Sequence, residues 1–196
     1  MTTILHIASS ANLKSSVTRQ IGAEVLKVLK TKNPAIKVIE RDLVKTAIPH
    51  LSPEAIDVFY QPGSPALAFS DELIDEVIAA DILLIETPMH NFSVSSRLKA
   101  WIDHIVRMGR TIDRGAERLE GLLKNKRAIL ILGRGGMYSE GPAKVMDYQE
   151  TYLRVIMNFI GITEIEVIYI ENVLKGGAVL EAALAAAKSK AQLVEA

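Results

Sequence analysis

The chain has 196 residues, of which 49% are hydrophobic and 23% are charged, so one sizeable core and a single domain over residues 1–196 are expected. Its 23 basic and 23 acidic residues balance, which excludes non-specific nucleic-acid binding through a cationic surface. Cysteine is absent, which excludes disulfides, thiolate nucleophiles and cysteine-ligated metals. The histidines lack metal-ligand spacing, which argues against a metal site. Without cysteines, any redox chemistry requires a bound cofactor.

Five short apolar runs predict buried parallel strands, at residues 4–8, 36–41, 82–86, 128–132 and 165–170. Helical patterns lie between and after them, at residues 17–30, 71–80, 95–108, 148–160 and 178–194, with Ser70 as the expected cap of the second. This alternation is typical of an α/β fold with right-handed crossovers. Two longer connections, 43–69 and 109–127, are either solvated excursions or walls of a pocket or subunit contact.

The amino-terminal apolar run is far shorter than the core of a signal peptide and reads as a first strand. Nowhere do about 18 apolar residues follow one another, as a membrane-spanning helix requires. We therefore expect a cytoplasmic protein without a membrane partner.

The loop after the first strand is rich in hydroxyl groups and leads into the first helix. Ser10, Ser16 and Thr18 offer donors there, and the free N–H groups and dipole of a helix start attract a phosphate. The composition suits a phosphomonoester, although an ordinary serine-capped loop has the same residues. The GxxxxGK[ST] pattern of a P-loop is absent.

The loop after the third strand reads TPMHNFS from Thr87. Met89 and Phe92 offer soft and flat apolar surface, and Asn91 offers a donor and an acceptor, which suits the face and edge of an isoalloxazine ring. The alternative is a turn with two core anchors. Histidine is a common proton donor in catalysis, which makes His90 a candidate for that role, although packing at the ring edge or binding through its backbone is favoured.

The loop after the fourth strand reads GRGG, comprising Gly133, Arg134, Gly135 and Gly136. Glycines allow close approach to a planar ligand, and Arg134 is a candidate for placing positive charge near a reduced, anionic flavin. Alone the motif is weak, and it lacks the GxGxxG spacing of a permanently held dinucleotide. In the flavodoxin-like strand order 2-1-3-4-5, however, strands one, three and four are adjacent, so the three loops converge.

Several motifs spread over nearly the whole chain carry a family resemblance: SS followed by SSVT, RDL at residue 41, DELI at 71, PMHNF at 88, LKAWIDHIVRMGRT at 98, EGLL at 120, GRGG at 133 and FIGI at 159. Together they resemble the FMN-dependent NADH azoreductases, which also act as quinone reductases. The resemblance implies a flavodoxin-like, doubly wound, five-stranded parallel sheet of order 2-1-3-4-5 with helices on both faces.

The resemblance also implies a cofactor site in three parts. Ser10, Ser16, Val17 and Thr18 would hold the FMN phosphate and ribityl chain; Met89, His90, Asn91 and Phe92 would meet the isoalloxazine; and Gly133, Arg134, Gly135 and Gly136 would meet its pyrimidine edge. It further implies a homodimer with its flavin sites at the interface, and a two-step cycle in which NADH or NADPH reduces the flavin and a quinone or azo compound reoxidises it. Flavin chemistry then needs orientation and electrostatics rather than a protein nucleophile.

Four positions depart from the family pattern. His90 stands where tyrosine or tryptophan is frequent, Gly133 where serine is frequent, and Ile112 and Arg114 where aromatic residues often shape the acceptor pocket. These departures bear on acceptor range more than on flavin binding. Two rival functions stay open: a flavodoxin-type electron carrier, whose usual strong acidity this chain lacks, and a flavin-free interaction module on the same fold.

Overall fold

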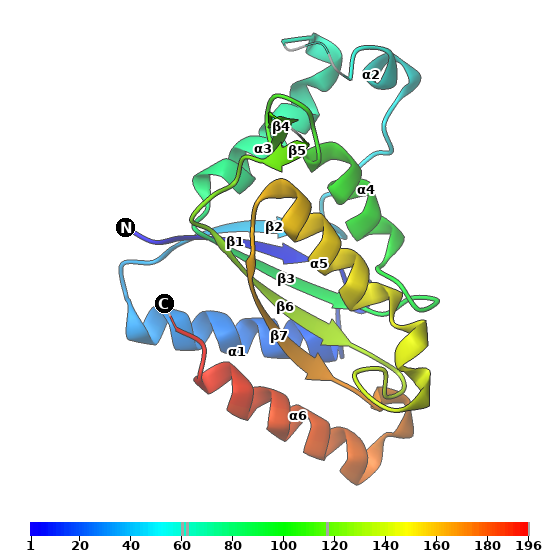
Figure 1. The fold of residues 1–196 in the computed structure, drawn as a ribbon. Coiled ribbons are helices and arrows are strands. Elements are labelled where there is room, and N and C mark those ends of the chain that lie inside the picture. The colour runs from blue at the N-terminus through cyan, green and yellow to red at the C-terminus, as the bar shows by residue number, and fades with distance from the viewer. Residues whose placement is uncertain (60, 62, 117, 196) are drawn as a thin grey trace.

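The computed structural model describes residues 1–59, 61, 63–116 and 118–195. Its centre is a parallel sheet in the order β2-β1-β3-β6-β7 (Figure 1). The strands are β1 (Thr3–Ala8), β2 (Lys37–Asp42), β3 (Ile82–Pro88), β6 (Arg127–Gly133) and β7 (Glu164–Ile170). The five predicted strands are all present, and β3 runs two residues beyond its predicted end.

Two short strands, β4 (Ile112–Arg114) and β5 (Leu119–Gly121), were not predicted. They pair antiparallel in a separate two-stranded sheet, so the parallel sheet reads 2-1-3-6-7 rather than 2-1-3-4-5 in chain numbering. Three residues are too few for an alternating apolar pattern to appear in sequence. The pair lies in the described part of the long connection 109–127.

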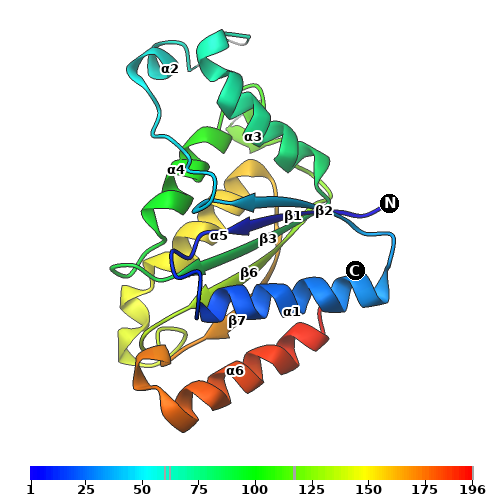
Figure 2. The same cartoon turned by 180° about the vertical axis from the view of Figure 1, so that it is seen from behind.

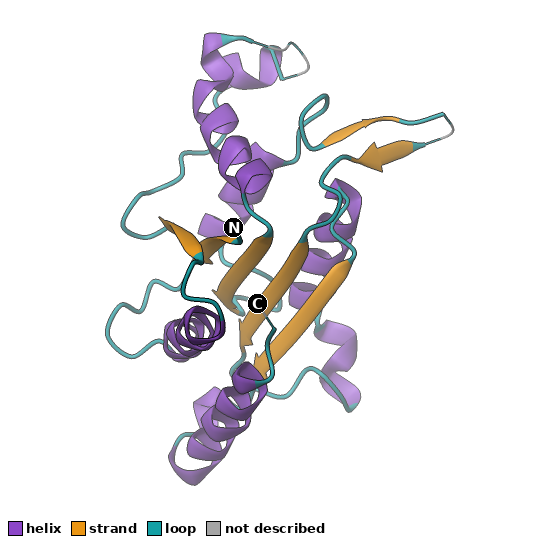
Figure 3. Cartoon of the chain, turned by 90° about the vertical axis from the view of Figure 1, so that its left-hand side faces the viewer, coloured by secondary structure: helices purple, strands orange, loops and turns teal. Residues whose placement is uncertain are grey.

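Helices cover both faces of the sheet, as Figures 1 and 2 show from opposite sides. One face carries α1 (Val17–Lys32) and α6 (Gly177–Gln192), and the other carries α3 (Ala68–Ala79), α4 (Ser96–Ile105) and α5 (Tyr148–Ile160). A hydrophobic core lies on each face of the sheet, and alternate residues of a strand point into one or the other. In β3, Leu83 and Ile85 pack toward α3–α5, and Leu84 packs toward α1 and α6. Figure 3 shows the two helical layers on either side of the strands.

Ser70 does not cap the second predicted helix. The helix α3 begins three residues earlier than predicted, which places Ser70 inside it. The buried Ser70 hydroxyl donates to the carbonyl of His104 at 2.6 Å and accepts from the guanidinium of Arg107 at 2.8 Å. Ser70 therefore ties α3 to the end of α4, a contact between distant segments that capping rules do not anticipate. The helix α4 ends at Ile105, three residues before its predicted end.

The remaining elements are short. The helix α2 (Pro53–Asp57) and the 3₁₀ helix η1 (Pro65–Leu67) occupy the described part of connection 43–69. Two more 3₁₀ helices, η2 (Pro142–Met146) and η3 (Val173–Lys175), follow β6 and β7. Among the described residues, no helix is both long and apolar enough to cross a membrane.

A buried acid–base group lies between the sheet and α1. Glu86 of β3 is fully buried, and neither of its carboxylate oxygens has a hydrogen-bond partner among the described residues. Its Oε2 is 3.6 Å from Nε2 of His6, whose Nδ1 is 2.6 Å from the exposed Glu40 carboxylate. Burial lowers the pKa of His6, but the two neighbouring carboxylates raise it above its ordinary value overall.

Candidate functional site

The start of α1 is arranged to receive an anion. Ser16 caps the helix by accepting a hydrogen bond from the Arg19 N–H at 3.3 Å, and its Oγ lies 3.0 Å from the Thr18 hydroxyl. No acidic residue occurs in the first turn. The first N–H groups of a helix lack intrahelical partners, and the helix dipole is positive there. The hydroxyls and N–H groups of Ser16–Thr18 therefore favour a phosphate at this position.

Arg19 holds the β1–α1 loop in place. Its Nε and Nη2 donate to the carbonyl of Ser10 at 3.1 and 2.9 Å, and its two terminal nitrogens donate to Asp42 at 2.8 and 3.0 Å. Burial would raise the pKa of the Asp42 carboxyl, but hydrogen bonds from Arg19 and two backbone amides lower it to about 2. The sequence prediction missed Arg19 as part of the site, although Asp42 belongs to the RDL motif noted above.

The Arg19–Asp42 ion pair predicts that the stability of the fold is sensitive to acid. The folded-state pKa is lowered from 3.8 to about 2, so the pair stabilises the fold above pH 4 and loses its effect as the pH falls through 2. We expect the unfolding free energy of the wild type to fall by about 1–2 kcal/mol more than that of Asp42→Asn between pH 5 and pH 2. Urea unfolding across this range measures it, and equal acid sensitivity of the two proteins would contradict the assignment.

The loop after β3 is a tight, strained turn. His90 and Ser93 exchange two backbone hydrogen bonds of 2.9 and 3.0 Å, and the two residues between them, Asn91 and Phe92, have φ values of 48° and 69°. Asparagine tolerates the left-handed region, whereas a bulky residue such as phenylalanine adopts it only at a cost in conformational energy. Strain of this kind is found where function requires a particular side chain.

Two variants of Phe92 isolate this strain. Phe92→Ala and Phe92→Gly both remove the ring, but only glycine adopts a positive φ without cost. We expect the glycine variant to be about 1 kcal/mol more stable than the alanine variant. Urea unfolding of the two variants measures the difference in their unfolding free energies. Both variants lose the ring contacts, so that loss cancels in the comparison. A glycine variant no more stable than the alanine variant would show that the turn is unstrained.

The GRGG loop makes close contacts at two of its glycines. A Cβ on Gly133 would lie 2.6 Å from Cγ2 of Thr18, and a Cβ on Gly135 would lie 2.7 Å from Cδ1 of Leu174. Glycine at these positions lets the loop approach both the start of α1 and η3. The three loops are thus packed against one another at the carboxyl edge of the sheet.

The guanidinium of Arg134 does not supply a free charge to this edge, contrary to the sequence prediction. Its side chain is fully buried and donates to Asp147 at 2.7 Å, Glu171 at 3.1 Å and Gln149 at 3.1 Å. It also lies over the ring of Tyr169, 5.0 Å from the centroid. Three carboxylates, the third being Glu150 at 3.5 Å, compensate its charge, so the side chain acts as a structural anchor.

One cavity of about 470 Å³ unites the three loops, a size usual for small-molecule sites. Nine of the twelve predicted site residues line it: Ser10, Ser16, Val17, Thr18, Met89, His90, Gly133, Arg134 and Gly135. Asn91, Phe92 and Gly136 do not. Asn91 instead lines a second cavity of about 440 Å³, which shares His90 with the first and reaches Lys99 and Tyr152.

Sequence reasoning missed one wall of the cavity. Val173 and Leu174 of η3 line it, although they follow β7 and belong to no motif singled out above. Leu174 is an exposed apolar residue four positions after the end of β7, which is the signal that was available in the sequence. The departures Ile112 and Arg114 do not line this cavity: Ile112 is buried in the core, and Arg114 lies in β4.

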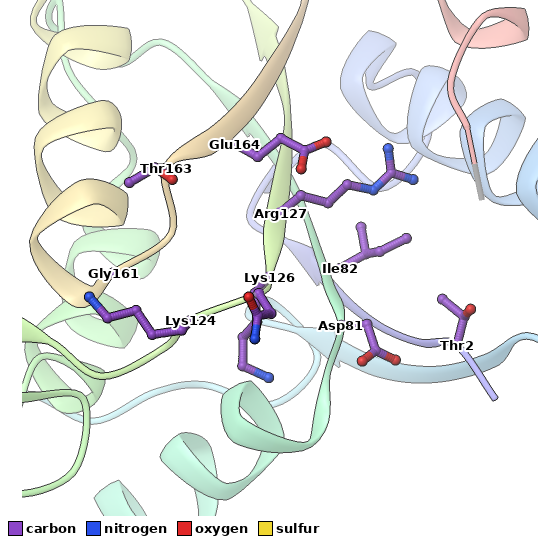
Figure 4. Close-up of a pocket in the computed structure, with 10 residues that line it drawn as sticks. Thr2, Asp81, Ile82, Lys124, Lys126, Arg127, Gly161, Thr163 and Glu164 are labelled. Carbon is purple, nitrogen blue, oxygen red and sulfur yellow. The ribbon is translucent and has the colours of Figure 1, made fainter.

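Figure 4 shows a larger cavity, of about 610 Å³, at the opposite edge of the sheet. Asp81, Lys126 and Arg127 line it where β3 and β6 begin. The Lys126 ammonium donates to the carbonyl of Ile78 at 2.7 Å, and Arg127 donates to the carbonyl of Glu195, so both cations already have partners. Ligands of open parallel sheets bind at the carboxyl ends of strands, which favours the smaller cavity as the functional site.

Comparison with known proteins supports this assignment. A family described as "Flavodoxin-like fold" matches residues 2–194. The FMN-dependent NADH:quinone oxidoreductase of Francisella philomiragia is 46% identical over 173 residues, which is 88% of each chain. Its namesake from Herminiimonas arsenicoxydans is 38% identical over 192 residues, 94% of each chain.

Two solved structures have the same fold. The azoreductase from Bacillus anthracis str. Sterne superimposes with a TM-score of 0.88 at 27% identity, covering 99% of this chain and 100% of that one. The FMN-dependent NADH-azoreductase from Bacillus anthracis str. Ames Ancestor, solved in complex with FMN, has a TM-score of 0.86 at 22% identity, covering 97% and 98%. The family model and the two relatives show that the chain belongs to the flavodoxin-like family and, within it, to the FMN-dependent NADH:quinone oxidoreductases.

Proposed function

We propose that the protein is an FMN-dependent oxidoreductase that passes two electrons from NADH or NADPH to quinones or azo compounds. The observation that carries the proposal is the convergence of the three predicted loops on one cavity of about 470 Å³. Relatives with this activity in their names match nearly the whole chain. Flavin carries the hydride chemistry when bound, so the chain itself must bind, orient and shield.

The chemistry of the residues that line the cavity fits FMN. The capped, acid-free start of α1 suits the phosphate, with Ser10, Ser16 and Thr18 as hydroxyl donors. Met89 of the second loop and Gly133 and Gly135 of the third loop line the same cavity, where a flat ring would lie between the two loops. The guanidinium of Arg134 is held by carboxylates and its backbone N–H donates to the carbonyl of Ile170 at 2.8 Å, so Arg134 would contribute by holding the third loop in place.

The resemblance also supports an order of events, in which the nicotinamide leaves before the acceptor enters the same open face. We propose this ping-pong order together with a homodimer in the cytoplasm. Ile112 and Arg114 do not line the cavity of their own chain, so these departures have no direct contact with an acceptor bound there. His90 is exposed between the two cavities, a position from which a proton donor can reach either.

An anaerobic spectrum tests the proposal. Purified protein reconstituted with FMN is expected to be yellow, to bleach within seconds of adding NADH, and to regain its colour with benzoquinone. A yellow protein that NADH does not bleach supports the electron carrier instead. A colourless protein that does not bind added FMN contradicts both flavin functions and leaves the interaction module.

A further inference from the structure

A buried carboxylate lies directly behind the phosphate seat, by which we mean the start of α1 at Ser16–Thr18. Glu86 is fully buried and packs against Gly22, where a Cβ would overlap its carboxylate. Gly22 lies one helical turn after Thr18, and Glu86 stands two residues before Pro88, which lines the cavity from the same face of the sheet. One turn of helix and two residues of strand place the carboxylate about 5–7 Å behind the level of Thr18.

The imidazole of His6 is the group that can neutralise this carboxylate. Its Nε2 lies 3.6 Å from Oε2 of Glu86, and neither that nitrogen nor either carboxylate oxygen has a hydrogen-bond partner among the described residues. A buried carboxylate without donors is costly unless a cation stands beside it. Glu86 therefore depends on the proton of His6 for its compensation.

Charged side chains act on the pair from β2 and α1. The Glu40 carboxylate of β2 lies 2.6 Å from Nδ1 of His6 but is 61% exposed, so solvent screens it. Arg19 of α1 is attracted electrostatically by Glu86, but its guanidinium donates to Asp42. Burial lowers the pKa of His6, but Glu86 and Glu40 raise it above its ordinary value overall, so His6 keeps its proton to a higher pH than a free histidine.

Other described groups around Glu86 are apolar or turn away. Ile131 of β6 is its neighbour in the sheet register, and Ile21 and Val25 of α1 are buried on the same side. The carboxylate of Glu24 on α1 accepts from Gln192 of α6. The proton of His6 therefore decides the net charge at this point of the core.

We propose that His6 and Glu86 form a proton-binding site linked to the phosphate seat, so that FMN binds more tightly while His6 carries its proton. The inference rests on the proposed function. Loss of the proton leaves a buried negative charge behind the seat, and this charge repels a phosphate dianion through packed protein of low dielectric constant. Linkage is reciprocal, so weaker binding at high pH requires that FMN binding draws a proton to the pair.

The first test measures the dissociation constant of FMN from the apoprotein by quenching of flavin fluorescence. Between pH 7 and pH 9 a phosphate monoester is already a dianion, and the constant is expected to rise about 3- to 10-fold in the wild type. Riboflavin lacks the phosphate, so its constant should change less than about twofold. Absence of FMN binding at both pH values would contradict the proposed function. Binding with the same constant at both pH values would contradict the linkage alone.

Two variants identify the group that is responsible. Glu86→Gln keeps the shape of the side chain but removes its charge, so the dissociation constants at pH 9 and pH 7 should agree within about twofold. Glu40→Gln is the matched control, because it removes the exposed carboxylate from the same histidine and leaves Glu86 in place. Its pH dependence should stay larger than that of Glu86→Gln. Equal pH dependence in the two variants would show that Glu86 is not the linked group.

Proton uptake by the wild-type protein provides a test that does not depend on the folding of a variant. Calorimetric titration with FMN in buffers of different ionisation enthalpy counts the protons that binding takes up. Between pH 7 and pH 9 we expect a maximum of about 0.2–0.5 proton for each FMN, and no uptake with riboflavin. No uptake with FMN, or equal uptake with riboflavin, would overturn the link between the pair and the phosphate seat.

Discussion

Replacing Arg134 with methionine is expected to lower the free energy of unfolding by about 3–5 kcal/mol. The change keeps much of the side-chain volume but leaves Asp147, Glu150 and Glu171 without their shared cation. The guanidinium is fully buried, so water cannot take its place without opening the structure. Urea unfolding with constant denaturant slope measures the loss.

Arg154 provides a matched control for this prediction. It also pairs with Glu150, at 2.8 Å, but its side chain is 42% exposed. Arg154→Met is therefore expected to cost less than about 1 kcal/mol, as exposed ion pairs do. In the Arg134→Met protein, a second change, Asp147→Asn, should restore part of the stability, because it removes one uncompensated charge. Equal losses for Arg134→Met and Arg154→Met would contradict the role of Arg134 as a buried anchor.

Gly22→Ala is the second change with a large expected effect, and its sign is opposite to the general rule. In a helix interior, alanine is normally about 1 kcal/mol more stable than glycine. Here a Cβ would lie 2.0 Å from Oε2 and 3.1 Å from Cδ of the fully buried Glu86. Because α1 packs on the sheet at this point, we expect a net loss of about 2–3 kcal/mol.

A double-mutant cycle makes the explanation testable. In a Glu86→Ala background the obstacle is gone, so Gly22→Ala should be neutral or stabilising by up to about 1 kcal/mol. Unfolding free energies of the four proteins give the coupling between the two sites. If Gly22→Ala destabilises both backgrounds equally, Glu86 is not the cause. Thermal unfolding at one fixed pH is suitable, since the neighbouring His6 titrates.

The sequence prediction succeeded where a feature depends on neighbouring residues and failed where it depends on residues far away in the chain. Residues 82–88 form a buried strand because a continuous apolar run has few other stable positions in an α/β fold. Ser70 was assigned wrongly because capping is a local rule, whereas its actual partners, the His104 carbonyl and Arg107, are more than thirty residues away. The β4–β5 pair was missed because each strand is only three residues long.

The same distinction applies within the site. Ser16, Thr18, Met89 and Gly133 were predicted as site residues from their residue types and their places after strands, and the structure brings them to one cavity. The direction of a long side chain cannot be derived in this way. Arg134 follows a strand next to glycines, but its guanidinium turns to carboxylates that lie 13 to 37 residues further along the chain.

Composition, apolar periodicity and motif spacing were sufficient for the strands, their alternation with helices and the three loops at one edge of the sheet. These properties follow from local preferences and from the short, right-handed crossovers that connect parallel strands. The partners of charged and aromatic side chains depend on which distant segments the packed sheet brings within a few ångströms. For that reason the anchoring of Arg134 by carboxylates and the obstacle at Gly22 became visible in three dimensions alone.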